Sequence, residues 1–194
     1  MITVQQKPTE VSTAVKNVFE TDPKSHYLFS WGKLGDIKAG REHLGDEMPV
    51  VVYRMLEYSL NNVLFNHFGS EKADELLREA GRLAGSEYAK NVLPLDADEP
   101  DFISALTDSI SELKIGILRV EKGDFARGAF TITVHEDIDC SGLPVSDELV
   151  CCYDEGFIAG ILETYLRKPI DVREIDCWAN GSRVCRFEGK VRNE

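Results

Sequence analysis

Five cysteines are the residues of this chain whose type and spacing best fit a chemical role. Cys177 and Cys185 flank an Asn180-Gly181-Ser182 segment, and the seven residues between them centre on Gly181. A three-residue loop here would place the two thiols opposite each other on paired strands, with Cβ atoms ~5 Å apart. A two-residue loop would shift the register and separate them. Two thiols at that separation could share one metal ion.

Two thiolates are too few for zinc, which takes four nitrogen, sulfur or carboxylate ligands in a tetrahedron. Cys151 and Cys152 lie near the start of a predicted helix just before this hairpin, and the positive end of a helix favours a thiolate. Glu174 and Asp176 are nearby carboxylate candidates. The alternative is that these cysteines are simply small buried hydrophobic residues. An odd number of cysteines without an export signal favours reduced thiols over disulfides.

Other catalytic patterns are missing from the sequence. The four histidines are scattered, and no Ser-His-Asp set or Gly-x-Ser-x-Gly elbow occurs. Asp154 and Glu155 are adjacent on a predicted helix, so they face different directions and are expected to be solvated. No GxGxxG or GxxxxGK[ST] pattern provides a phosphate cradle. The sequence therefore favours a protein that is not an enzyme.

The elements that must position these cysteines begin with helices. Residues 1–48 carry scattered glycines without a clear period and are expected to be extended or irregular. Apolar residues recur at helical spacing from Pro49 to Phe68, again over 71–92 behind Ser70 as N-cap, and a third time around 102–113. Three helices therefore precede every predicted strand.

The second half predicts a sheet interrupted by one long helix. β-branched alternation over 115–120 and 129–135 indicates an antiparallel pair. Ser146 then caps a helix predicted over 147–166, and strands over 170–178 and 183–189 flank the Asn-Gly turn. The fold class is α+β: an N-terminal helical half packed on an antiparallel sheet, with a long helix before a C-terminal metal-binding hairpin.

Size and charge limit the classes of partner. A chain of 194 residues fits one domain, or one domain with an N-terminal extension. With 22 Lys and Arg against 34 Asp and Glu, the net charge is −12 and no uninterrupted basic stripe exists. Nucleic acid and anionic membranes are therefore not expected as partners. No apolar run approaches ~18 residues and no signal segment opens the chain, so a cytoplasmic location is expected.

Several sequence stretches together resemble the 4-vinyl-reductase (V4R) domain family. The stretches in the second half are Val150-Cys151-Cys152-Tyr153-Asp154-Glu155-Gly156-Phe157, Lys168-Pro169, Val172-Arg173-Glu174-Ile175-Asp176-Cys177 and Val184-Cys185-Arg186. Those in the helical half are Met48-Pro49-Val50, Tyr53-Arg54, Ala80-Gly81 and Ala84-Gly85. The resemblance implies a ligand-binding domain over 48–194, preceded by an extension over 1–47. The implied fold is the one that haem nitric-oxide sensors share with vesicle-tethering subunits.

The resemblance also implies a ligand set for zinc. Sensor domains of aromatic-responsive activators in this family hold zinc with three cysteines and one glutamate. Their spacing corresponds to Cys151, five residues before Gly156-Phe157, to Glu174, three residues before Cys177, and to Cys185. Such a set fills a tetrahedron and leaves no position for an activated water, so a structural metal is expected. On this pattern Cys152 is a plain buried thiol and Cys140 a loop residue.

Strand geometry creates one difficulty for this ligand set. Glu174 and Cys177 are an odd number of residues apart and should face opposite sides of a regular strand. A β-bulge near Ile175 and Asp176 would bring both to the same side. Without a bulge, Glu174 is an ordinary surface carboxylate.

The resemblance further implies an apolar ligand cavity. Seven side chains lie on elements that enclose such a cavity in the related fold: Tyr53, Leu56, Phe65, Phe102, Phe130, Tyr153 and Phe157. Apolar residues at helical spacing are also what an ordinary core requires, so this alternative stays open. Gly156 and Gly160 would let a ligand or another helix approach closely.

The expected function is binding or sensing of an apolar, aromatic or acyl small molecule. The signal would pass through a homodimer, as the resembling domains generally pair, or through a protein effector. A first alternative, from the family's name, is an enzyme or substrate-handling accessory in tetrapyrrole vinyl-group reduction, although no hydride-donor site is visible. A second alternative is a purely structural dimerisation subunit.

Overall fold

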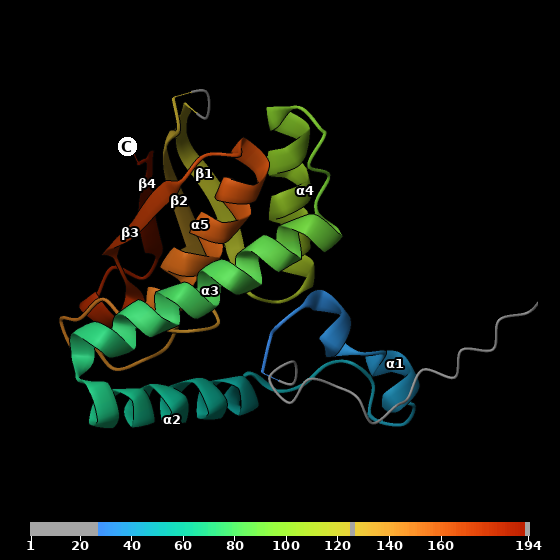
Figure 1. Ribbon diagram of the computed structural model, residues 1–194. Coiled ribbons are helices and arrows are strands. Elements are labelled where there is room, and N and C mark those ends of the chain that lie inside the picture. The colour runs from blue at the N-terminus through green and yellow to red at the C-terminus, as the bar shows by residue number, and fades with distance from the viewer. Residues whose placement is uncertain (1–26, 125–126, 193–194) are drawn as a thin grey trace, which may run out of the picture.

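The computed structural model describes residues 27–124 and 127–192. The expectation that residues 1–26 are extended or irregular lies outside the described residues. The helices are η2 (Trp31–Leu34), α1 (Ile37–Gly40), α2 (Val50–Phe68), α3 (Ser70–Val92), α4 (Glu99–Glu112), α5 (Cys152–Leu166) and η3 (Trp178–Asn180). The strands are β1 (Ile117–Asp124), β2 (Ala129–His135), β3 (Ile170–Asp176) and β4 (Cys185–Val191). Figure 1 shows the helices α3, α4 and α5 gathered beside the sheet.

The four strands form one antiparallel sheet in the order β1-β2-β4-β3. Both predicted hairpins are present, and β2 joins them by pairing with β4. The core lies between the sheet and the helices α4 and α5, with Leu106 and Ile161 from the helices meeting Ile132 and Phe187 from the strands. The predicted α+β fold, with three helices before the sheet and one long helix within it, is confirmed.

Helices α3 and α5 cross at very short range because glycines line their contact. A Cβ on Gly81 would lie 2.0 Å from the carbonyl oxygen of Tyr153, and a Cβ on Gly156 would lie 2.0 Å from that of Arg78. Gly160 has the same relation to α3. Of the two occupants predicted for the space beside Gly156 and Gly160, the structure places another helix there.

Helix α5 begins five residues later than predicted. Asp147, expected to be its first residue, has a left-handed φ of 61°, and the Ser146 amide donates to the carbonyl oxygen of Ala179 at 2.8 Å. Ser146 therefore ties a loop to the C-terminal hairpin and does not cap the helix. Cys151 takes the N-cap position, and its carbonyl accepts the first helical bond from Glu155.

The C-terminal hairpin has a longer connection than the three-residue loop considered from the sequence. Strand β3 ends at Asp176, which pairs with Arg186, and Cys177 opens a 3-10 turn over Trp178–Asn180. Gly181 closes this turn with a left-handed φ of 97°. The hairpin register still continues toward Cys177 and Cys185, so both cysteines lie at the same end of the sheet.

Helix α2 packs weakly on the body of the domain, and none of its residues is buried. Large apolar side chains are exposed along it: Val50, Val51, Val52, Met55, Leu56, Leu60, Val63, Phe65 and Phe68. Across the described ranges, no helix is both long enough and apolar enough to cross a membrane.

The segment before α2 contacts α3. The Trp31 amide donates to the Glu87 carboxylate at 3.1 Å, and the Trp31 ring lies 6.2 Å from that of Tyr88. The boundary between an extension and the domain at residues 47 and 48 stays a prediction.

Candidate metal centre

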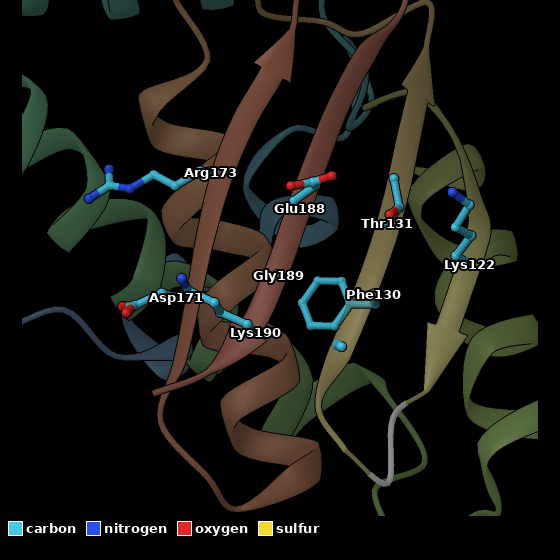
Figure 2. Close-up of a pocket in the computed structure, with 9 residues that line it drawn as sticks. Lys122, Phe130, Thr131, Asp171, Arg173, Glu188, Gly189 and Lys190 are labelled. Carbon is cyan, nitrogen blue, oxygen red and sulfur yellow. The ribbon is translucent and has the colours of Figure 1, made fainter. Parts of the chain in front are cut away.

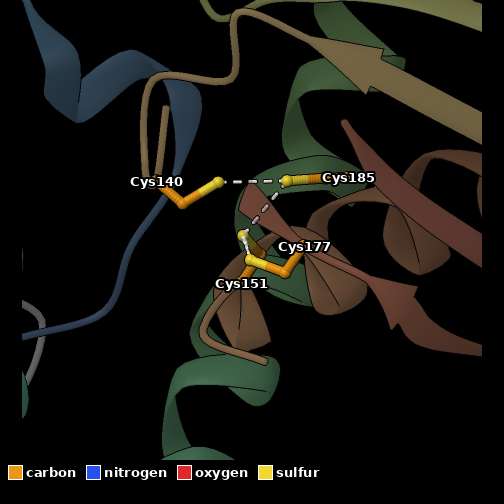
Figure 3. Close-up of side chains that lie close together, drawn as sticks. All are labelled: Cys140, Cys151, Cys177 and Cys185. Carbon is orange, nitrogen blue, oxygen red and sulfur yellow. Dashed lines mark hydrogen bonds between the residues drawn. The ribbon is translucent and has the colours of Figure 1, made fainter. Parts of the chain in front are cut away.

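Four of the five cysteines meet at one end of the sheet. Cys140 lies in the turn after β2, Cys151 caps α5, Cys177 follows β3 and Cys185 opens β4 (Figure 3). All four are buried, and their sulfur atoms lie within 4.8 Å of one another. We call this group the thiol cluster. It joins three segments that are far apart in the sequence.

Two sulfur separations in the thiol cluster match those between ligands of one tetrahedral metal ion, and a third is shorter. With Zn–S bonds of ~2.3 Å, two ligand sulfurs of a tetrahedron are ~3.8 Å apart. The Sγ of Cys151 lies 3.7 Å from those of both Cys177 and Cys185, while Cys140 and Cys185 approach to 3.0 Å. No disulfide links these cysteines. The four-sulfur donor set is one that zinc binds in structural sites.

The electrostatics of the thiol cluster favour a cation. Contacts with the other three thiols lower the pKa of Cys177, which also accepts bonds from the amides of Asn180 and Val150. The corresponding thiol contacts raise the pKa values of Cys151 and Cys185. A divalent ion among these sulfur atoms would stabilise their thiolate forms.

Glu174 reaches the same region through a β-bulge. The register of β3 against β4 shifts between Glu174 and Asp176, so Ile175 is the extra residue and turns outward. The bulge proposed from the spacing of Glu174 and Cys177 is confirmed, and both side chains are buried. One Glu174 oxygen accepts from the Cys151 amide at 3.1 Å, and the other has no hydrogen-bond partner among the described residues. Burial, followed by the charge of Cys177, raises the Glu174 pKa to about 8.

Cys140 is the member of the thiol cluster that sequence reasoning missed. It is a loop residue, as expected, but its side chain is fully buried against Cys185. The pairing of β2 with β4 sets Val134 opposite Cys185 and so brings the turn after β2 to the thiol cluster. Only a prediction of strand order would have revealed this contact.

Cys152 lies apart from the thiol cluster, as expected, but it is not the buried core thiol that the sequence predicted. It is half-buried, and the Arg78 guanidinium lies 3.6 Å from its sulfur. Burial raises its pKa to about 12, so the thiol stays protonated at neutral pH.

Asp154 and Glu155 are buried, and the expectation that they are solvated is wrong. The Glu155 carboxylate contacts Arg78 and Arg173 and accepts from the Glu174 amide at 2.8 Å. It links α3, α5 and β3. Asp154 turns the other way, toward Asp137 beside the thiol cluster. The close glycine contact between α3 and α5 buries this turn of the helix.

The seven candidate ligand residues do not line one cavity in the described part of the chain. Leu56 and Phe65 lie on α2 and are 69% and 54% exposed. Phe102 is a core residue that stacks on Tyr165 with ring centroids 3.7 Å apart. The Tyr53 hydroxyl donates to Asp139 at 2.8 Å.

The remaining three candidates lie nearer the sheet and α5. Phe130 is buried and covers Gly189 on the neighbouring strand. Tyr153 and Phe157 stack on each other, with ring centroids 6.3 Å apart. Phe157 also meets the ring of Tyr88, at 5.5 Å. Phe157 lines a small apolar cavity between helices and sheet.

That apolar cavity lies between α4, α5, β1 and β2 and has a volume of about 20 Å³. Its lining is entirely apolar: Leu106, Ile110, Leu118, Ile132, Phe157, Ile158, Ile161 and Leu162. We call it the core seam. A volume of ~10–15 Å³ is the minimum for one water, so the core seam is nearly closed.

Two larger hollows have linings that mix polar and apolar groups. One of about 390 Å³ lies on the outer face of the sheet, where Lys122, Arg173 and Glu188 surround it (Figure 2). The other, of about 550 Å³, lies between α2, α3 and the loop before α5, and Asn61, Asp74 and Cys152 help to line it. Both linings combine charged or amide groups with the ring of a candidate ligand residue, Phe130 in the first hollow and Phe65 in the second.

Comparisons with known proteins agree with this fold. Residues 130–191 match the model of the V4R domain. Two uncharacterized proteins of Methanocaldococcus jannaschii are similar to this chain. MJ1642 is 29% identical over 77% of this chain and 82% of its own length. MJ0150 is 26% identical over 83% of this chain and 98% of its own length. The resemblance to the V4R domain family predicted from the sequence is confirmed.

Solved structures share the fold at low sequence identity. The phenol-responsive sensory domain of the transcription activator PoxR, solved with phenol, gives a TM-score of 0.60 at 17% identity and covers 76% of each chain. A vinyl-4-reductase family protein from Methanocaldococcus jannaschii gives 0.56 at 18% identity, over 77% of this chain and 85% of that one. A third similar structure is subunit 3 of a trafficking protein particle complex from Naegleria fowleri, covalently bound to palmitic acid. Its TM-score is 0.59 at 12% sequence identity, and the match covers 74% of this chain and 95% of that one.

Proposed function

We propose that this chain is a small-molecule-binding or sensing domain whose fold is held together by a structural zinc ion. The observation that carries the proposal is the thiol cluster, which joins the turn after β2, the start of α5 and the C-terminal hairpin. The V4R resemblance supports the same combination of a metal site with a ligand-binding fold.

Cys151, Cys177 and Cys185 are the proposed thiolate ligands, and two side chains compete for the fourth position. The family resemblance implies Glu174, whose buried oxygen without a partner is available to a metal. The geometry favours Cys140, whose sulfur lies within 4.8 Å of the other three. When bound, zinc would supply structural cross-linking, and the chain's own contribution is to bury the ligands and orient them through the amides of Asn180 and Val150.

The proposed ligand site is the core seam, because its lining accepts only an apolar molecule. The PoxR sensory domain was solved with phenol and the trafficking subunit with palmitic acid, which supports an aromatic or acyl ligand for this fold. At about 20 Å³ the core seam must open to admit either one.

A thermal-shift screen tests the ligand site. Phenols, alkylbenzenes, fatty acids and tetrapyrroles would be added to the purified protein, and a ligand at ~100 Kd should stabilise the fold by about 2.7 kcal/mol. Ile110→Phe fills the core seam and should abolish the shift, whereas Leu113→Phe, on the exposed end of the same helix, should preserve it. A shift of equal size in both variants would place the ligand elsewhere.

A structural dimerisation subunit is the second candidate, and the near-closure of the core seam favours it. If no apolar compound changes the melting temperature, the core seam is ordinary packing. The exposed apolar face of α2 would then be the main functional surface.

A further inference from the structure

Four carboxylates gather beside the thiol cluster, in a region that the proposed zinc site does not use. Asp137 and Asp139 come from the turn after β2, Asp154 from the first turn of α5, and Glu57 from α2. Asp137 and Asp139 are 2% and 1% exposed, and Asp154 is 8% exposed. Burying a carboxylate without a cation or a proton to neutralise it costs free energy of folding. The burial of several acids at one place therefore requires an explanation.

No salt bridge in the described part of the chain holds these acids, although the charge of Arg54 acts on Glu57. No ion pair among the described residues includes any of the four. Arg54 lies nearby, but its guanidinium donates to the carbonyl oxygens of Ile138 and Ser141 at 2.6 and 2.9 Å. Arg54 therefore shapes the loop that carries Asp137 and Asp139.

Hydrogen bonds satisfy only part of the group. Asp139 accepts from the Tyr53 hydroxyl at 2.8 Å, and Asp137 accepts from the Asp139 amide at 2.8 Å. The second oxygens of Asp137, Asp139 and Glu57 are buried and have no partner in the described part of the chain. Such orphaned acceptors are what an absent cation would leave behind.

The geometry around Asp137 forms a second donor set. Carboxylate oxygens of Asp137 and Asp154 and the sulfur of Cys151 lie within 4.8 Å of one another. Cys151 also belongs to the thiol cluster, so the two donor sets share one thiolate. Mixed carboxylate and thiolate ligands suit zinc better than calcium or magnesium, which prefer oxygen alone.

Charge balance points the same way. One divalent ion neutralises only half the charge of four thiolates, and the adjacent carboxylates add further negative charge to a buried volume. Without a second cation, the buried side chains of Asp137, Asp139 and Asp154 would have to be neutral, protonated acids.

We propose that Asp137 and Asp154, with Cys151 as a bridging thiolate, hold a second zinc ion beside the thiol cluster. This inference rests on the proposed zinc site, because the bridging thiolate needs a metal on both sides. The second ion ties the turn after β2 to the first turn of α5 by carboxylates, where the first ion ties them by sulfur.

Native mass spectrometry of the full chain, purified with Zn²⁺ and then exchanged into metal-free buffer, tests the proposal. The wild type should carry two zinc ions per chain, and Asp154→Asn and Asp137→Asn should each carry one. Glu163→Gln alters a carboxylate at the far end of α5 that contacts Arg82, and it should retain two. Circular dichroism of each variant checks that the fold is kept.

The outcomes separate the two proposals. One zinc in the wild type and in both Asp variants overturns the second site, leaves the first intact and assigns protons to the acids. If each Asp variant still carries two zinc ions per chain, the second ion is not held by Asp137 and Asp154, and the inference is overturned. No zinc in the wild type would overturn both proposals. If an Asp variant fails to fold, the wild-type count and the other variant still decide.

Discussion

At the scale of single residues, Cys140 shows how much a side chain's role depends on distant pairing. Its sequence neighbours, Ser141 and Gly142, indicate a turn, and the residue does lie in one. Strand β4 nevertheless sets Cys185 beside the end of β2, so a loop thiol becomes part of the thiol cluster. The chemistry of the cysteine was visible in the sequence, but its partner was not.

Cys140→Ser should therefore weaken metal binding. A hydroxyl is a poorer zinc ligand than a thiolate, and we expect the zinc affinity to fall at least about 100-fold. Competition with a chromogenic chelator measures the change. Cys152→Ser is the matched control, because that thiol is half-buried and lies outside the thiol cluster. Equal affinities in the two variants would show that Cys140 is not a ligand and would favour Glu174 as the fourth.

At the scale of elements, local patterns predicted most of the fold. Helical spacing identified α2, α3 and α4, and the ligand set implied by the family resemblance required a bulge between Glu174 and Cys177, which β3 has. The start of α5 was misplaced because Ser146 is a residue type favoured at helix N-caps. In the structure its amide donates instead to the carbonyl oxygen of Ala179 in the hairpin. That bond, like the order of the strands, depends on tertiary packing that local patterns do not contain.

The contact of α3 with α5 holds Cys151 and Asp154 in place, so its glycines should be intolerant of substitution. Gly81→Ala would drive a methyl group into the backbone of Tyr153, and overpacking of this kind costs about 1–3 kcal/mol of unfolding free energy. Denaturant unfolding measures the loss. Gly40→Ala is the control, since nothing lies within 4 Å of its added methyl group. Similar stabilities for the two variants would contradict the close packing of these helices.

At the scale of the whole molecule, the exposed apolar face of α2 is the surface best suited to self-association. Many large apolar side chains exposed along one helix are typical of an interaction site, and the family resemblance implies pairing. We expect a homodimer at micromolar concentration. Leu56→Glu should shift the molecule to a monomer, as judged by light scattering, because it would bury an unpaired charge in the interface.

Leu113→Glu is the control for the dimer, because it places the same charge on an exposed leucine outside α2. It should leave the dimer intact. A monomeric wild type, or a dimer that survives Leu56→Glu unchanged, would contradict the assignment of α2 as the interface.

The central claim is that a metal held by the thiol cluster stabilises the fold. The most direct test is the melting temperature of the zinc-loaded and metal-stripped protein under reducing conditions. Zinc at ~1,000 Kd should contribute about 4.1 kcal/mol, which for a domain of this size corresponds to a shift of roughly 8–16 °C. A drop of that size on stripping, restored by adding zinc back, is the predicted result. A protein that binds no stoichiometric metal and melts at the same temperature with and without chelator would contradict the account.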